Sequence, residues 1–165
     1  IATPLVLCDE EFPRSLDAFP LEYGETMRNH ARVYGDDAFT GVSIAREDLR
    51  RACETQIKSH LLHLREGFIE TDGDPSAVGR LIAASAPAFS ALLRNVARLN
   101  GVTSTERLEA TRAGAHAANV PDALVNDLLA LERPGAMPTS DPPRLFPDYL
   151  AAVEHLARFV DSWRA

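Results

Sequence analysis

A chain of 165 residues, of which 45% are hydrophobic and 25% charged, is long enough to bury a core as one domain. Its formal net charge of −7 gives no general attraction to DNA or RNA, so no nucleic-acid partner is expected. No apolar run approaches the roughly 20 residues that span a bilayer, so no membrane contact is expected. Cys8 and Cys53 lie far apart and outside any zinc-ligand spacing, which indicates reduced thiols in a cytoplasmic protein.

The first 45 residues predict a short segment that contains β-structure. The run "TPLVLC" favours a strand, "DEEFPRSLDAF" suits a short helix capped by Asp9, and residues 20–28 and 31–34 favour two strands before a turn at Gly35. Two or three short strands make only a marginal sheet. They either pack on the helices as a flap or are the last strands of a sheet whose earlier part is absent from this chain. The missing starting Met is a hint that residue 1 need not be the natural beginning of the polypeptide.

Two long helices follow. Apolar residues recur every three or four positions from Arg46 to Glu70, which predicts one helix, and the next is expected over residues 75–99. The stretch "TDGDP" separates them: Gly73 suits a left-handed conformation, and Asp74 suits the N-cap of a helix that starts at Pro75. Because the break is so short, the two helices should pack antiparallel.

Three more helices are expected in the rest of the chain. The first runs to about Ala118 with a capping box at Thr103 and Glu106, the second lies in "VPDALVNDLLALE", and the third runs from about Pro142 to Trp163 with Asp141 as its cap. "RPGAMPTSDPP" holds too many breaks to be anything but a loop. The predicted fold is mainly α, an antiparallel bundle of about five helices over residues 46–165 after the β-containing segment of residues 1–45.

The run that begins "PLVLCDEEFPRSLDAFPLEYGETMRNHARVYGDD" and continues to Glu70 resembles the region after the catalytic motifs in a group of bacterial nucleotidyltransferase-like proteins. The similarity covers roughly residues 3–100 and returns weakly at "LFPDYLAAVEHLARFVD". In that group a polymerase-β-like nucleotidyltransferase fold precedes a helical bundle. The resemblance implies a helical accessory domain that positions a substrate.

The family's catalysis needs a Gly-Ser turn that holds phosphate and an acidic pair that holds magnesium, and neither is recognisable here. The chain alone is therefore not expected to be active. No cofactor is expected in it, and Mg²⁺ and a nucleoside triphosphate are expected only if a catalytic domain is present.

Leu21-Glu22-Tyr23 resembles the family's acidic residue between two hydrophobic residues on a late strand, which implies a catalytic carboxylate at Glu22. The alternative for Glu22 is an ordinary solvent-facing residue on a half-buried strand.

Arg50, Glu54, Lys58 and Arg65 share one face of the first long helix. One interpretation is a solvated ladder of ion pairs. In the other, this face lines the cleft of a nucleotidyltransferase, where Arg50, Lys58 and Arg65 would bind substrate and Glu54 would act as a catalytic base. No metal site is expected, since the pair His60 and His63 has no further ligand set.

Three functions remain open: the accessory domain, a stand-alone helical interaction module that partners a minimal nucleotidyltransferase, and a structural bundle that oligomerises. A strand edge at residues 20–34 would pair with a second copy or fold onto the bundle. The expected assembly is therefore a homodimer with Leu21 and Tyr23 in the contact, and a nucleotidyltransferase domain is the other expected partner.

Overall fold

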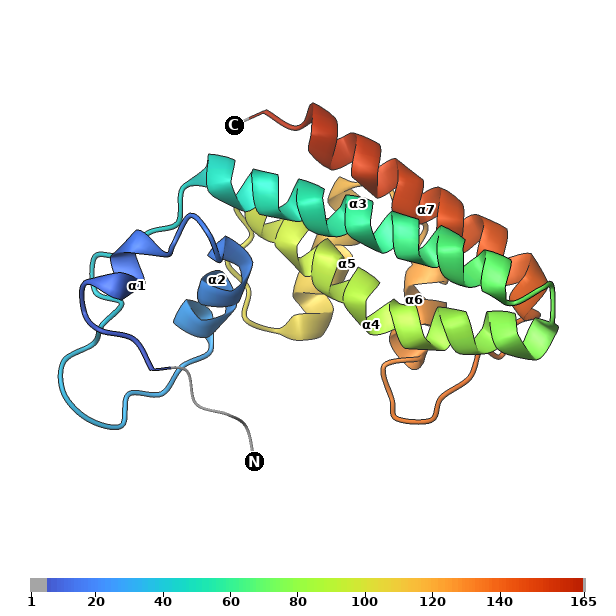
Figure 1. Cartoon of the computed structure of the whole chain (residues 1–165), viewed down its shortest axis with the longest axis horizontal. Helices are drawn as coiled ribbons and strands as arrows, with labels where there is room; N and C mark the ends of the chain where they lie inside the picture. The colour runs from blue at the N-terminus through green and yellow to red at the C-terminus, as the bar shows by residue number, and fades with distance from the viewer. Residues whose placement is uncertain (1–5, 165) are drawn as a thin grey trace.

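The computed structural model describes residues 6–164, and this part of the chain contains seven α-helices and no strand. Figure 1 shows the two longest, α3 (Arg46–Glu70) and α4 (Pro75–Leu99), running antiparallel, with α7 (Pro142–Ser162) packed against both. Helices α5 (Arg107–Ala117) and α6 (Asp122–Ala130) also pack on α4. The expected helical bundle is confirmed. The N-terminal end carries two short helices, α1 (Glu11–Arg14) and α2 (Pro20–Arg28).

Local chemistry sets the boundary between α3 and α4 as predicted. Gly73 has a φ of 76°, a left-handed conformation that glycine adopts without steric cost. The Oδ2 atom of Asp74 accepts a hydrogen bond of 2.7 Å from the backbone N–H of Ala77, and Pro75 occupies the first helical position. The chain therefore reverses direction within a few residues and starts a new helix.

Replacing Asp74 with alanine should lower the free energy of unfolding by about 1 kcal/mol, because the first turn of α4 loses its side-chain cap. Asp141→Ala is the matched control: Asp141 also precedes a proline at the start of a long helix, but its side chain makes no capping hydrogen bond. Urea denaturation of both variants checks this. Equal losses in the two variants would contradict the role of the cap.

Helix α4 is the central helix of the bundle. It contacts α3, α5, α6 and α7, and its buried residues include Ile82 and Phe89, both with no exposed surface. By length and composition alone α4 is also apolar enough to cross a membrane. Burial among four other helices accounts for the same composition, because the core helix of a bundle is apolar on most of its surface.

The strands predicted at residues 20–28 and 31–34 are wrong. The first span is α2, which begins with Pro20 at its first turn, and the second is irregular. Leu21 and Tyr23 are both buried, but against different neighbours: Leu21 belongs to the bundle core, whereas the Tyr23 ring packs on Phe12 of α1. A helix that packs between two surfaces carries apolar residues on two of its sides. In the sequence this arrangement resembles the alternation of apolar and polar residues in a strand.

The absence of a strand edge among residues 6–164 removes the contact on which the homodimer was predicted. Leu21 and Tyr23 are each only 6% exposed within one chain, so neither is free for a second copy. A homodimer stays a prediction without that basis. Residues 3–5 of the expected strand "TPLVLC" lie outside the described residues, and residues 6–8 are not in a strand.

Two of the predicted caps also differ in the structure. Asp9 does not cap α1, whose N-cap is Glu10 with no capping side chain. The box at Thr103 and Glu106 does not form, because α5 begins only at Arg107. Instead, the hydroxyl of Ser104 accepts a hydrogen bond of 3.2 Å from the backbone N–H of Glu106 just before the helix.

Candidate functional site

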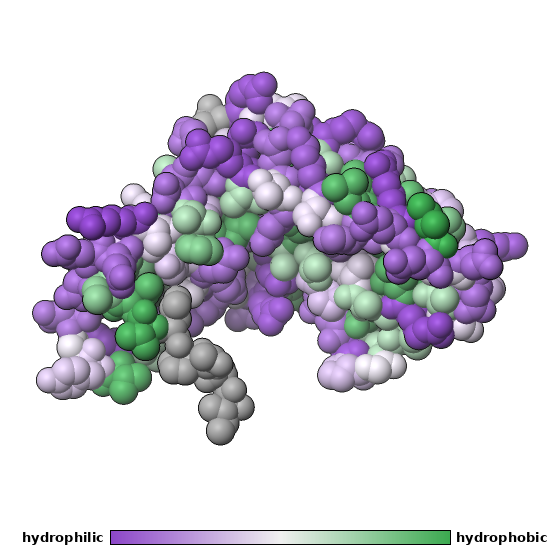
Figure 2. All heavy atoms as spheres, viewed as in Figure 1, coloured by the Kyte–Doolittle hydropathy of each residue, from purple (hydrophilic) through white to green (hydrophobic). Residues whose placement is uncertain are grey.

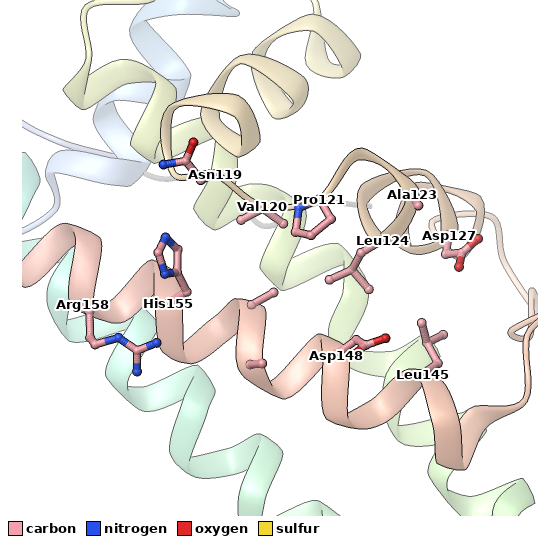
Figure 3. Close-up of a pocket in the computed structure, with 12 residues that line it drawn as sticks. Asn119, Val120, Pro121, Ala123, Leu124, Asp127, Leu145, Asp148, His155 and Arg158 are labelled. Atoms are coloured by element: carbon pink, nitrogen blue, oxygen red, sulfur yellow. The ribbon is translucent and has the colours of Figure 1, made fainter.

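A groove of about 580 Å³ lies between α6, α7 and the turn that joins α5 to α6. Its floor is apolar and includes buried Leu124 and Leu145. Figure 3 shows the polar groups at its two ends: His155 and Arg158 of α7 lie at one end with Asn119, and Asp127 and Asp148 lie toward the other.

The groove exists because small side chains line it. Ala123 of α6 and the neighbouring Ala151 and Ala152 of α7 leave open a space that larger residues would fill. At one end, Asn119 has a φ of 50°, a left-handed conformation that asparagine tolerates better than most residues. The chain turns there, and Pro121 then serves as the N-cap of α6.

This arrangement suits binding more than catalysis. Apolar walls with a few polar groups at fixed places are typical of small-molecule sites. The lining holds one histidine and two aspartates and no serine, threonine or cysteine, so it offers no hydroxyl or thiol that a base could activate. Among residues 6–164 no three His, Cys, Asp or Glu side chains are grouped as metal ligands. With a cation at one end and carboxylates at the other, the groove fits a small molecule that carries an anionic group at one end and a cationic group at the other.

Three of the residues predicted from the sequence, Arg50, Glu54 and Lys58, do come together. The guanidinium of Arg50 donates to Glu54 at 2.8 Å, and Lys58 pairs with the same carboxylate and with Asp161 of α7 at 3.4 Å. Arg50, Glu54 and Asp161 line an open hollow of about 650 Å³ together with Trp163.

These ion pairs leave little free charge for a substrate. Hydrogen bonds from Lys58 and Arg50 lower the pKa of the Glu54 carboxyl, which makes it a weaker base. The solvated ladder accounts for the geometry without a ligand. The substrate-binding role of Arg50 and Lys58 and the catalytic role of Glu54 stay predictions.

The other two predicted site residues lie apart from this cluster. Arg65 pairs with Glu154 of α7 at 2.6 Å and so joins the two helices. Glu22 is exposed in the first turn of α2. The resemblance placed Glu22 on a late strand, but this segment is a helix, so the catalytic role of Glu22 loses that structural setting.

His60 and His63 do not act as a pair. The Nε2 atom of His60 is 3.0 Å from the hydroxyl of buried Tyr149, and its ring stacks on Phe89, whereas His63 is exposed and meets Glu66. Burial lowers the pKa of His60 to about 4, with a smaller contribution from the charge of His63. His60 is therefore a neutral structural residue at neutral pH.

The groove between α6 and α7 was missed in the sequence. No spacing motif in the sequence singles out His155, and the only signal for the groove is the pair of small residues Ala151 and Ala152 that precedes it on the same helix. Comparison of the chain with protein-family models, curated proteins and solved structures gives no match. The family resemblance therefore rests on the quoted sequence runs.

Proposed function

We propose that this chain is a helical accessory domain that positions the acceptor substrate for a nucleotidyltransferase catalytic domain. The groove between α6 and α7 is the observation that carries the proposal. It offers about 580 Å³, an apolar floor, and opposite charges at its ends, as a site for a small polar acceptor requires. Mg²⁺ and the nucleoside triphosphate would belong to the catalytic domain.

The N-terminal end supports a contact with such a domain. Of ten large apolar side chains that are exposed in the described residues, five lie before residue 45, and Val33 and Tyr34 are each 96% exposed. Figure 2 shows apolar surface at this end of the molecule and further apolar surface toward the opposite end. Exposed apolar groups in one region mark an interaction surface. Its members are Val6, Leu7, Phe19, Val33 and Tyr34.

The same surface supports a second function, the stand-alone interaction module. In that case the chain would bind a minimal nucleotidyltransferase or a second copy of itself through the N-terminal end, and the α6/α7 groove would stay empty. Binding of small molecules in the groove therefore distinguishes the two functions.

We expect no nucleotide transfer by the purified chain alone, because its sequence has neither the phosphate-holding turn nor the paired carboxylates of metal-assisted transfer. The measurement is incorporation of labelled ATP, GTP, CTP or UTP in the presence of Mg²⁺. Magnesium-dependent incorporation by this chain would contradict the accessory role.

The groove itself is tested with Ala151→Phe, which fills it from an exposed position on α7. Small-molecule fragments that bind the purified chain should shift the NMR signals of groove residues. The A151F substitution should lower the affinity of these fragments by at least about tenfold. Ala84→Phe is the control, since Ala84 is exposed on α4 outside the groove. Fragments that never shift groove signals, or that both variants weaken equally, would refute the positioning role.

A further inference from the structure

Four arginines meet at the junction of α2, α4 and α5. None of them belongs to the α6/α7 groove or to the ion-pair ladder of α3. They line a narrow niche that shares no residue with the α6/α7 groove. Only one of the residues that line the niche is acidic, which makes it a basic site in a chain with a net charge of −7. The arginines are Arg28, Arg94, Arg98 and Arg107.

Two of these arginines are held in place by the fold. The side chain of Arg98 is only 8% exposed, and its Nη1 donates to Asn95 Oδ1 at 3.0 Å and to the carbonyl of Leu21 at 3.4 Å. Arg28 donates to the carbonyl of Val102 at 3.4 Å. Bonds to neutral oxygens orient both guanidinium groups, and Arg98 in addition pairs with Glu25, so of the two only Arg28 keeps a charge without a carboxylate partner in the described residues.

Arg94 is the most unusual of the four. Its Nη1 atom is buried and has no hydrogen-bond partner. Burial, followed by the nearby charge of Arg107, lowers the pKa of Arg94, so its positive charge is held at a cost in free energy. A buried donor without an acceptor is uncommon in proteins and calls for a specific explanation.

The acidic groups near the niche do not balance this charge. Glu25 pairs with Arg98, and Glu109 accepts the Ser104 hydroxyl at 2.7 Å. Glu132 raises the pKa of Arg94 through its charge, but it forms no ion pair with Arg94 within 4.0 Å, and its Oε1 is itself buried without a partner. Arg28 and Arg107 remain without a carboxylate partner in the described residues.

The start of α5 adds to the positive potential. The helix begins at Arg107, and its N-cap Glu106 makes no capping hydrogen bond. Ser104 and Thr105, just before that start, also line the niche. The positive end of the helix dipole therefore lies at the site where the arginines meet.

We propose that this niche binds the phosphoryl group of a small organic phosphate. Its enclosed part, about 20 Å³, has room for one oxygen-sized group. One phosphoryl oxygen sits there, and the others lie at the mouth beside the exposed residues Asn29, Thr105 and Arg107. Guanidinium groups suit this ligand because their paired N–H donors match the oxygens of phosphate.

The organic part of the ligand has space next to the niche. A groove of about 530 Å³ shares Arg28, Arg98 and Val102 with it. Apolar residues of α2 and α3, including Met27 and Leu49, line that groove. A phosphate monoester with an apolar group therefore fits better than inorganic phosphate. This assignment does not depend on the proposed function, because it involves different residues.

Isothermal titration at low ionic strength tests the site with inorganic phosphate, phenyl phosphate and AMP as probes. Each should bind saturably, and phenyl phosphate should bind about tenfold more tightly than inorganic phosphate, because the groove takes up its ring. In NMR spectra the shifts caused by inorganic phosphate should be confined to residues 25–29, 94–98 and 102–110, whereas phenyl phosphate should also shift Leu49 and its neighbours in the groove. AMP that binds more tightly than phenyl phosphate would identify a nucleotide as the organic phosphate.

Arg107→Gln is the variant of choice, since Arg107 is exposed and its loss should not unfold the protein. This substitution should lower the affinity for phenyl phosphate by at least about tenfold, as expected when one charge-assisted hydrogen bond is lost. Arg112→Gln, also exposed on α5 but outside the niche, should leave binding unchanged.

Three results would overturn the assignment. Failure of all three probes to bind would rule out a phosphoryl site. Equal weakening by Arg107→Gln and Arg112→Gln would mean that general surface charge, and not the niche, attracts the anion. Inorganic phosphate that binds as tightly as phenyl phosphate would refute the proposal that the ligand is an organic phosphate.

Discussion

Replacing Gly114 with alanine should lower the free energy of unfolding by about 3 kcal/mol or more. A Cβ atom at this position would lie 1.8 Å from the carbonyl oxygen of Leu93 and 2.6 Å from its carbonyl carbon. Both atoms belong to the backbone of α4, which cannot rotate away as a side chain can. Helix α5 would have to move off α4, and the buried contacts between them would be lost.

The control for this substitution is Gly67→Ala on α3. There the added Cβ would meet only the end of the Leu81 side chain, at 2.7 Å, and that side chain can move. Alanine also has the higher helix propensity, by about 1 kcal/mol, so the net change should be small. Urea denaturation measures both variants. If Gly114→Ala unfolds at the same urea concentration as Gly67→Ala, α5 does not cross α4 this closely.

The second large effect is a loss of stability in mild acid that depends on His60. Burial lowers the pKa of His60 from 6.5 to about 4 in the folded protein. Between these two pH values the unfolded chain binds a proton that the folded chain does not, so stability falls as the pH decreases. From pH 7 to pH 5 the expected loss is about 2 kcal/mol.

His60→Gln should remove most of this pH dependence, because glutamine does not titrate and still offers a polar group to the Tyr149 hydroxyl. His116→Gln, at an exposed position on α5, should retain it. The measurement is urea denaturation of the parent and both variants at pH 7, 6 and 5. A parent protein equally stable at pH 7 and pH 5 would show that His60 is protonated without a cost in the folded state.

Local interactions explain which parts of the fold were predictable. The boundary between α3 and α4 depends on a few consecutive residues, since Gly73 turns the chain and Asp74 caps the next helix. The pairing of Arg50, Glu54 and Lys58 follows from helical spacing alone, because residues four apart lie on one face. Their partner Asp161 comes from α7, and only the packing of α7 on α3 brings it near.

The N-terminal end shows where local pattern fails. Leu21 and Tyr23 are both buried, and apolar residues two positions apart are compatible with a strand and with a helix. Which of the two forms depends on the surfaces that cover each residue. The bundle covers Leu21, and α1 covers Tyr23. Neither surface belongs to the few residues around Leu21 and Tyr23 that a local pattern covers, so the alternation predicted a strand where packing against α1 and the bundle selects a helix.

The sequence by itself determined the helical class, the two long helices and the ladder of charges along α3, because each depends on residues within a few positions of one another. Only the tertiary structure decided the α6/α7 groove and the arginine niche. The niche takes Arg28 from α2, Arg94 and Arg98 from α4, and Arg107 from α5. Arg94 and Arg98 lie four residues apart on one helix face, but no sequence spacing connects them to Arg28 or Arg107, since only the close approach of three helices places these charges around one point.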